Sequence, residues 1–322
     1  MSNSAQAQLG AVLAAGGPTL ADLLERTEER LAEVAGGHGD ELARHAGGTL
    51  AAGGKRLRPV LVFLCAGEPS DRLVSAGAAV ELLHMATLVH DDVLDGAELR
   101  RGRATVFSSG GRRAATATGD LLFSRAFAEL AATGSEAAVS ALSTASSALA
   151  RGELMQRADA WSESVTRERY LERCRLKTAS LFEASCRLGA VFGERPDLAD
   201  PLGRFGEQLG VAFQMLDDVL DVSGPPERTG KPRGADLFDG TVTLPLILAR
   251  RRDPALTGAV RCAEEAAAIC DRIAATGALE EARAEALGHV DDAKRVLDGL
   301  DVTEQRRHAL QLVAEGVVER YA

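Results

Sequence analysis

Two acidic segments with the same pattern occur far apart in the chain. The first is Asp91-Asp92-Val-Leu-Asp95 and the second is Asp217-Asp218-Val-Leu-Asp221. Each follows an apolar stretch with helical spacing, so its first and last carboxylates, four residues apart, lie on one face of a predicted helix. Like charges at that spacing repel each other unless a cation lies between them. The pattern favours a site for Mg²⁺, which binds through few carboxylates and through substrate phosphates. Two exposed acidic helix ends are the weaker alternative.

Basic residues occur close to both acidic segments, although the net charge of the chain is −10. Lys55 and Arg58 lie three residues apart at a predicted helix start, where the helix dipole also favours an anion. Each basic pair alone is more often part of a solvated surface. Together they predict a site that binds phosphates both directly and through the metal. The other basic residues follow the acidic segments or stand between them: Arg100, Arg101, Lys177 and Lys231. Thr178 adds a polar hydroxyl beside Lys177.

The composition predicts that helices position these residues. Hydrophobic residues make up 46% of the 322-residue chain, but aromatic residues only 4%. Alanine and leucine lose little on entering a helix, whereas strands favour β-branched and aromatic residues. No proline occurs between Pro69 and Pro196, and no alternating run is long enough to carry a sheet. We therefore expect one all-α domain, a bundle of long helices over residues 19–322, after a flexible N-terminal segment over residues 1–18.

Charge, cysteine usage and hydropathy exclude several classes of protein. A nucleic-acid binder usually has a basic face, which a net charge of −10 makes improbable. The five cysteines form no CxxC pair, which argues against a disulfide framework and a structural zinc site. No run of about 18 apolar residues predicts a transmembrane segment, and the N-terminus lacks the basic region of a signal peptide. We expect a cytoplasmic protein.

Four motifs then occur in a recognisable order. They are Gly53-Gly-Lys-Arg-Leu-Arg-Pro59, His90-Asp-Asp-Val-Leu-Asp-Gly-Ala-Glu-Leu-Arg-Arg-Gly102, Leu176-Lys-Thr178 and Phe213-Gln-Met-Leu-Asp-Asp-Val-Leu-Asp221, with a Gly-Lys-Pro downstream. In order and spacing they resemble the trans-isoprenyl diphosphate synthase (polyprenyl synthetase) family, over nearly the whole chain. The resemblance implies the all-α isoprenoid synthase fold, with a central cavity between the acidic motifs, and a homodimer. It also implies a prenyltransferase that lengthens an allylic diphosphate with isopentenyl diphosphate.

The resemblance implies roles for residues that match these motifs. The implied Mg²⁺ ligands are Asp91, Asp95, Asp217 and Asp221. The implied catalytic groups are Asp91, Asp92, Asp95, Lys177, Asp217 and Asp218. The implied pocket for isopentenyl diphosphate consists of Lys55, Arg58, His84 and Arg101. The implied pocket for the allylic diphosphate consists of Arg100, Lys177, Thr178, Gln214 and Lys231. One departure is Thr241, which stands where the family usually has a lysine.

Product length is predicted from small residues ahead of the first acidic motif. Short-chain members of the family commonly have an aromatic residue there, whereas Ala86 and Thr87 leave the passage open. Leu83, one turn deeper, is the next candidate for a wall. We expect a long-chain product in the hexaprenyl to decaprenyl range, because each buried methylene favours binding by about 0.8 kcal/mol until sterics stop elongation. Release of such a product would allow transient contact with a membrane.

Three alternatives remain at this point. A class I terpene cyclase needs no isopentenyl site, so Lys55, Arg58 and His84 argue against it. A non-catalytic subunit of a heteromeric synthase typically lacks the aspartates that are intact here. A di-metal carboxylate bundle needs the Glu81-Leu-Leu-His84 element twice, and it occurs once. Of the remaining residues, His45 and His289 are expected at the surface, and Tyr170 carries no functional signal.

Overall fold

The computed structural model describes residues 3–51, 53–54, 56–67, 69–100, 102–224 and 232–319, and it confirms the predicted all-α class. Two short antiparallel strands, β1 (Leu99–Arg100) and β2 (Arg103–Ala104), are the strands in this described part. The helices are α1 (Asn3–Gly16), α2 (Pro18–Gly36), α3 (Asp40–Ala51), α4 (Leu57–Cys65), α5 (Asp71–Asp95), α6 (Val106–Ala131), α7 (Glu136–Ala158), α8 (Arg167–Cys174), α9 (Ser180–Phe192), α10 (Ala199–Ser223), α12 (Ala235–Phe238), α13 (Leu244–Arg250), α14 (Ala263–Ala275), α15 (Ala278–Asp298) and α16 (Glu304–Glu319). A π-helical turn, η1 (Arg175–Ala179), joins α8 to α9, and a 3₁₀ turn, η2 (Pro196–Leu198), precedes α10.

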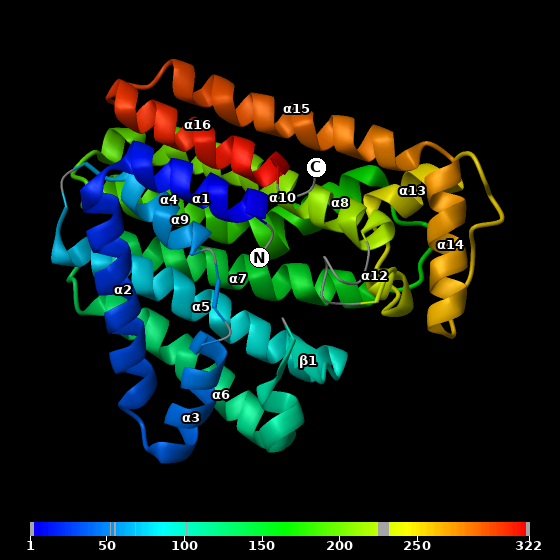
Figure 1. Cartoon of the computed structure of the whole chain (residues 1–322), viewed down its shortest axis with the longest axis horizontal. Coiled ribbons are helices and arrows are strands. Elements are labelled where there is room, and N and C mark those ends of the chain that lie inside the picture. The colour runs from blue at the N-terminus through cyan, green and yellow to red at the C-terminus, as the bar shows by residue number, and fades with distance from the viewer. Residues whose placement is uncertain are drawn as a thin grey trace.

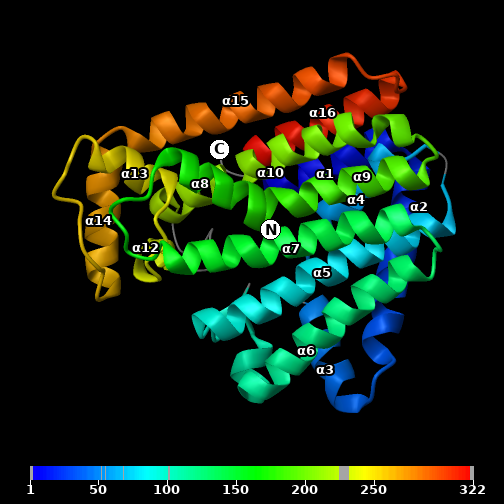
Figure 2. The same cartoon turned by 180° about the vertical axis from the view of Figure 1, so that it is seen from behind.

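The long helices lie side by side across the width of the molecule. Helix α6 packs on α5, α5 on α9, α9 on α10, and α10 on α15. Helices α15 and α16 form one edge and α3 and α6 the opposite edge, with α14 standing across one end (Figures 1 and 2). Because α5 and α10 both lie inside this stack, the two acidic segments at their C-terminal ends belong to the same bundle.

Helix α5 is, among the described helices, the one that is both long and apolar enough to cross a membrane. By length and composition it could span a membrane, because its most apolar 18-residue window has a mean hydropathy of 1.4. However, 72% of that window is buried against other helices, which is the usual state of the core helix of a bundle. Residues Ala7–Gly16 of α1 and helix α2 are together also long and apolar enough to span a membrane, but they are bent by 113° relative to each other. The burial of α5 therefore identifies it as a core helix of the bundle.

Two glycines allow η1 to lie very close to the neighbouring helices. A Cβ atom at Gly152 of α7 would lie 2.6 Å from the backbone nitrogen of Lys177, and one at Gly210 of α10 would lie 2.5 Å from Cα of Ala179. Real Cβ contacts are not that short, so only glycine fits at these crossings. The π-helical turn is thereby held between α7 and α10.

Three parts of the structure differ from the sequence-based expectations. Residues 3–16, expected in a flexible segment, form helix α1, which packs against α16, and Gln8 Nε2 donates to the carbonyl of Leu312 at 3.0 Å. His45 is buried rather than at the surface, because its ring fits where Gly110 has no side chain. His289 is half-buried, with Nδ1 lying 2.6 Å from Oε1 of Gln208.

Candidate active site

The first acidic segment occupies the last turn of α5. The helix ends at Gly96, whose φ of 63° lies in the left-handed region that glycine adopts without strain. The β1–β2 hairpin then brings Arg100 back, and its Nε donates to Asp92 Oδ1 at 2.7 Å. Asp92 is buried, whereas Asp91 and Asp95 keep accessible surface. Asp91 and Asp95 are therefore the carboxylates of this segment that can reach a ligand.

One face of α5 leads from this segment along the helix. His84, Thr87, Leu88 and Asp91 all keep partial exposure, and their spacing of three, four and seven residues places them on one helical face. Leu83 and Ala86 are fully buried in the core. Of the three predicted chain-length residues, only Thr87 thus borders open space. Neighbouring helices cover that side of α5, and the passage expected beside Ala86 and Leu83 stays a prediction.

Lys177 of η1 connects to the first acidic segment through a chain of charged side chains. Its Nζ lies 2.5 Å from Glu153 Oε2, and Glu153 also accepts from Arg157 Nε at 3.0 Å. Arg157 Nη2 in turn lies 2.5 Å from Asp95 Oδ1. Glu153 and Arg157 are four residues apart on α7, so they share a face. Helix α7 thereby supplies counter-ions both to the basic residue of η1 and to the acidic end of α5.

Thr178, the next residue of η1, connects to the second acidic segment. Its Oγ1 donates to Gln214 Oε1 at 2.6 Å, and Gln214 Nε2 donates to Asp218 Oδ1 at 2.7 Å. Tyr170 of α8 donates its hydroxyl to the other oxygen, Oδ2 of Asp218, at 2.7 Å. π-Helical turns are frequent at functional sites because they change which faces consecutive residues present. Here two consecutive residues of one turn are connected to the two acidic segments: Lys177 to the first through Glu153 and Arg157, and Thr178 to the second through Gln214.

The three aspartates of the second segment have different surroundings. Asp218 and Asp221 are buried, and Asp221 Oδ2 accepts from the backbone N–H of Asp236 at 3.2 Å. Asp217 is half-buried, so it is the member with accessible surface on this segment. The carboxylates that can reach a ligand are therefore Asp91 and Asp95 on α5 and Asp217 on α10.

Burial shifts the pKa of carboxyls in both segments. Burial raises the pKa of Asp91 to about 6; the Lys177 ammonium opposes this shift, and the carboxylates of Glu153 and Asp95 add to it. Burial together with the charge of Asp236 raises the pKa of Asp218 to about 8, against the hydrogen bonds from Tyr170 and Gln214. Carboxyls crowded in this way favour a bound cation.

The donor set fits Mg²⁺. Among the described residues, no three His, Cys, Asp or Glu side chains come close enough to enclose a metal ion by themselves. Mg²⁺ suits such a site, because it binds through one or two carboxylates and completes its shell with waters and substrate phosphates. The crowded Asp91 and Asp95 side chains can supply these one or two carboxylate ligands.

Comparisons with known proteins show which family the chain belongs to. The profile of the family described as Polyprenyl synthetase matches residues 40–273. The chain belongs to the polyprenyl synthetase family. It is 39% identical to the heptaprenyl diphosphate synthase component 2 of Geobacillus stearothermophilus over 296 residues, which cover 89% of this chain and 92% of that protein. It is 35% identical to the octaprenyl diphosphate synthase of Escherichia coli (strain K12) over 272 residues, 81% of this chain and 84% of that protein. A crystal structure of a polyprenyl synthase from Caulobacter crescentus CB15, complexed with calcium and isoprenyl diphosphate, matches with a TM-score of 0.88 at 32% identity and covers 98% of both chains.

The chain is thus a prenyl diphosphate synthase, a transferase of prenyl groups, and it resembles the long-chain members of the family. Of its predicted diphosphate contacts, the structure places Arg58 with its guanidinium 4.7 Å from the ring centre of Phe182, and His84 on the half-exposed face of α5. Arg100 pairs with Asp92, as described above. Lys55, Arg101 and Lys231 lie outside the described residues.

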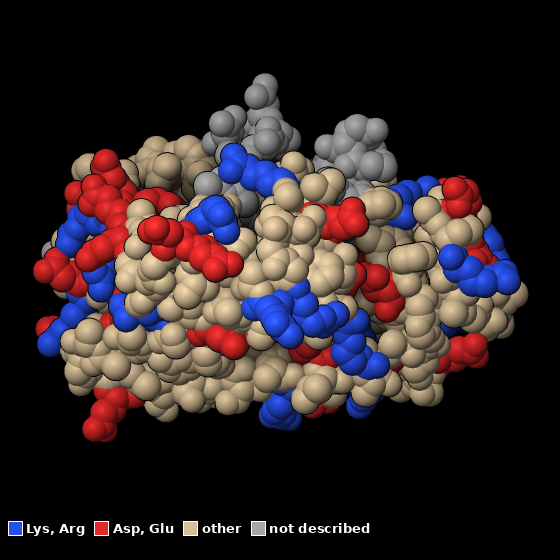
Figure 3. All heavy atoms as spheres, turned by 90° about the horizontal axis from the view of Figure 1, so that it is seen from below, with Lys and Arg blue, Asp and Glu red and all other residues tan. Residues whose placement is uncertain are grey.

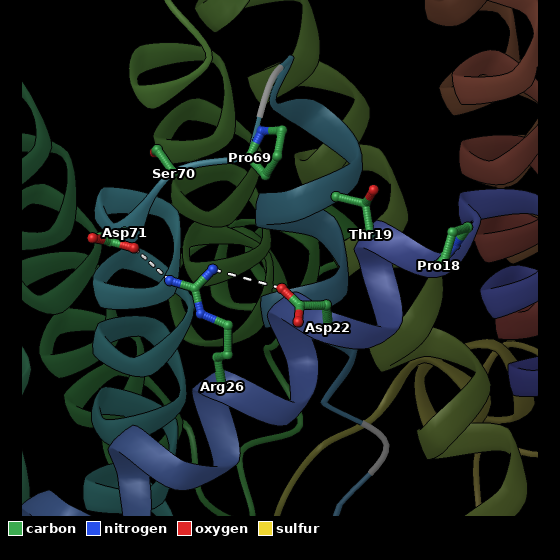
Figure 4. A pocket seen from close by; sticks show the side chains of 7 residues that line it. All are labelled: Pro18, Thr19, Asp22, Arg26, Pro69, Ser70 and Asp71. Carbon is green, nitrogen blue, oxygen red and sulfur yellow. Dashed lines mark hydrogen bonds and ion pairs between the residues drawn. The ribbon is translucent and has the colours of Figure 1, made fainter.

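A surface hollow of about 420 Å³ lies away from this site. It is formed by the start of α2 and the segment before α5, and Arg26 reaches across it between Asp22 and Asp71 (Figure 4). Asp71 is the first residue of α5, so helical rise places it about 30 Å from Asp91. On the face seen from below in the orientation of Figure 1, basic and acidic side chains are interspersed (Figure 3). The hollow does not belong to the synthase site.

Three residues of this synthase site were missed by the sequence analysis. Glu153 and Arg157 could have been found from their i, i+4 pairing on a predicted helix beside Gly152. Tyr170 could not, because it acts through a partner that is distant in sequence. Tyr170 is fully buried and bonds Asp218, although its sequence neighbours gave no signal.

We expect Tyr170→Phe to destabilise the synthase by about 1–3 kcal/mol, because it leaves Asp218 Oδ2 buried without its donor. Urea denaturation at neutral pH measures this free energy of unfolding. An unchanged free energy of unfolding would show that the hydrogen bond between Tyr170 and Asp218 is not formed, because loss of an unbonded hydroxyl costs almost nothing.

We also expect the metal-free synthase to become less stable as pH rises from about 5 to 8. The pKa of Asp91 is raised to about 6 and that of Asp218 to about 8, so the folded protein holds more protons than the unfolded chain in this window. The free energy of unfolding then falls with rising pH. Urea denaturation in EDTA at several pH values measures the slope, and Asp218→Asn should make it less steep. An equal slope in both proteins would contradict the assignment to Asp218.

Proposed function

We propose that the chain condenses isopentenyl diphosphate with an allylic prenyl diphosphate to give a longer all-trans polyprenyl diphosphate, with Mg²⁺ as cofactor. The observation that carries this proposal is the reach of η1 to both acidic segments through Lys177 and Thr178. A single diphosphate held at this turn would meet a cation, a hydroxyl and carboxylates from two helices. Such convergence suits ionisation of an allylic diphosphate, in which negative charge develops on the leaving group.

Asp91, Asp95 and Asp217 would hold Mg²⁺ together with the allylic diphosphate, and Asp221 would support the second segment from its buried position one turn beyond. The bound ion would supply positive charge at the leaving oxygen. Lys177 would exchange Glu153 for the diphosphate, while Thr178 and Gln214 would orient its oxygens. The apolar core around α5 would keep water away from the carbocation, which water would trap. No side chain of the described residues stands out as a base, so the released diphosphate would take the proton.

Isopentenyl diphosphate would bind His84 of α5 together with Arg58, which lies in the first turn of α4. The support for this position is that His84 lies two turns from Asp91 on the same half-exposed face of α5. The growing chain would then pass along the face that carries Thr87 and Leu88. Because Thr87 is small, we infer a long-chain product in the hexaprenyl to decaprenyl range.

The chemical class of the product separates this proposal from a terpene cyclase. Purified protein is incubated with Mg²⁺, isopentenyl diphosphate and a farnesyl or geranylgeranyl diphosphate primer, and the products are separated by chromatography. We expect longer prenyl diphosphates and no hydrocarbon. A cyclic hydrocarbon formed without isopentenyl diphosphate would establish the cyclase alternative.

We further propose that the active species is a homodimer in the cytoplasm. The relative from Geobacillus stearothermophilus is named as a component of its synthase, which raises the alternative of a heteromeric enzyme. The intact aspartates of both motifs argue that this chain carries the catalytic site itself. Light scattering combined with activity of the purified chain tests this, and an inactive chain that gains activity only with a second subunit would overturn the homodimer.

A further inference from the structure

Arg56 has an unusual backbone conformation for its residue type. With φ 48° and ψ 36° it is left-handed, although it is neither glycine nor asparagine, and it immediately precedes the first turn of α4. Its carbonyl accepts from the N–H of Val60 at 2.9 Å and so begins that helix. A side chain in this region is strained and persists only when the surroundings fix it. Such strain is frequent at ligand-binding segments.

The surroundings of Arg56 do fix it. Its guanidinium donates from Nη1 to Glu81 Oε1 of α5 at 2.7 Å, and it makes a two-pronged contact with Glu28 of α2, in which Nη2 lies 3.1 Å from Oε2. Nη2 also lies 3.5 Å from the carbonyl of Leu50 in α3. The side chains of Arg56 and Glu81 are only 11% and 6% exposed. One buried guanidinium thus ties the loop before α4 to three helices.

The neighbours of this ion pair are residues with a proposed role in binding isopentenyl diphosphate. Arg56 stands between Lys55 and Arg58 in the chain, and Glu81 lies three residues before His84 on α5, hence on the same side of that helix. The pair therefore joins the loop that carries the basic residues to the helix that carries the histidine. A shift of the loop against α5 would change the position of Arg58 relative to His84.

We propose that the Arg56–Glu81 ion pair is a positioning device for the isopentenyl diphosphate pocket. It holds the loop before α4 in register with α5, so that both sides of the pocket contact one diphosphate. Neither residue contacts the substrate in this account. Arg56 suits the role better than lysine, because its planar fork can bond two carboxylates at once. The proposal rests on the proposed function, since it requires a site for isopentenyl diphosphate.

The test is steady-state kinetics in which isopentenyl diphosphate and the allylic primer are varied independently. We expect Arg56→Met and Glu81→Gln to raise KM for isopentenyl diphosphate about tenfold, because small misplacements of binding groups are costly. KM for the allylic primer and kcat should change less than about twofold. Arg56→Lys should lie between Arg56→Met and the wild type. Glu81→Gln keeps the volume of the side chain, so it tests the positioning role even if Arg56→Met does not fold.

A matched control separates positioning from simple stabilisation. Arg30 of α2 and the buried Glu129 of α6 form a comparable pair, with two nitrogen–oxygen distances of 2.9 Å, away from the loop. Arg30→Met should lower the melting temperature and leave both KM values unchanged. If Glu81→Gln raises both KM values equally, or neither, while lowering the melting temperature, the pair is merely structural. An inactive wild type would instead overturn the proposed function, and this inference with it.

Discussion

Asp91→Ala should lower kcat by about a thousandfold or more while leaving the fold intact. Asp91 keeps accessible surface at the end of α5 and interacts electrostatically with the Lys177 ammonium. Its contribution grows as charge develops on the leaving diphosphate. The same loss is expected for Asp217→Ala, because Asp217 is the half-buried member of the second segment. Diphosphate release under saturating substrates measures kcat, and circular dichroism with thermal melting measures the fold.

The stability of Asp91→Ala gives an independent check. Burial and the carboxylates of Glu153 and Asp95 raise the pKa of Asp91, so its charged form is unfavourable in the metal-free protein. We therefore expect the variant to be at least as stable as the wild type above pH 6 without metal. Asp71→Ala, at the far end of the same helix, removes only an exposed ion pair with Arg26 and should keep full activity. Near-wild-type rates for both Asp91→Ala and Asp217→Ala would contradict the two-segment site.

Thr87→Tyr should shorten the product to farnesyl or geranylgeranyl diphosphate while the first condensation stays close to the wild-type rate. Thr87 lies four residues before Asp91 on the half-exposed face of α5, so an aromatic ring there would stand about one turn from the metal-binding carboxylates. Its hydroxyl bonds the carbonyl of His84 at 2.7 Å, and Thr87→Ser keeps that bond. Chromatography of dephosphorylated products measures chain length.

Ala86→Phe is the informative comparison. Ala86 has no exposed surface, so a phenylalanine would overpack the core and cost about 1–3 kcal/mol of stability. We expect this variant to lose stability without a specific change in product length. If Ala86→Phe shortens the product and Thr87→Tyr does not, the chain leaves the metal site on the other side of α5.

The positions of the two residues around α5 explain why we expect the two variants to differ. At about 100° per residue, Thr87 lies about 40° from Asp91 around the helix, whereas Ala86 lies about 140° away. The sequence analysis predicted both residues to line the passage, and the helical spacing separates them. Which faces of α5 are covered depends on α6 and α9, whose packing is not encoded in the local pattern.

The helical class and the family could be predicted from sequence, because both rest on local composition and on motifs of fixed spacing. The acidic segments do lie at the C-terminal ends of long helices, as their apolar flanks indicated. The supporting partners could not be predicted in the same way. Tyr170 acts on Asp218 and Arg56 acts on Glu81 across helix contacts, and a single sequence does not specify such contacts.

The central claim is that one site ionises the allylic diphosphate and joins the cation to isopentenyl diphosphate. Its most direct test is the amount of diphosphate released per labelled isopentenyl unit incorporated, with Mg²⁺ and a geranylgeranyl diphosphate primer. We predict a ratio of one throughout elongation, and no release when either the primer or the isopentenyl diphosphate is omitted. Release of diphosphate from the primer without incorporation of label, accompanied by a hydrocarbon product, would contradict the account.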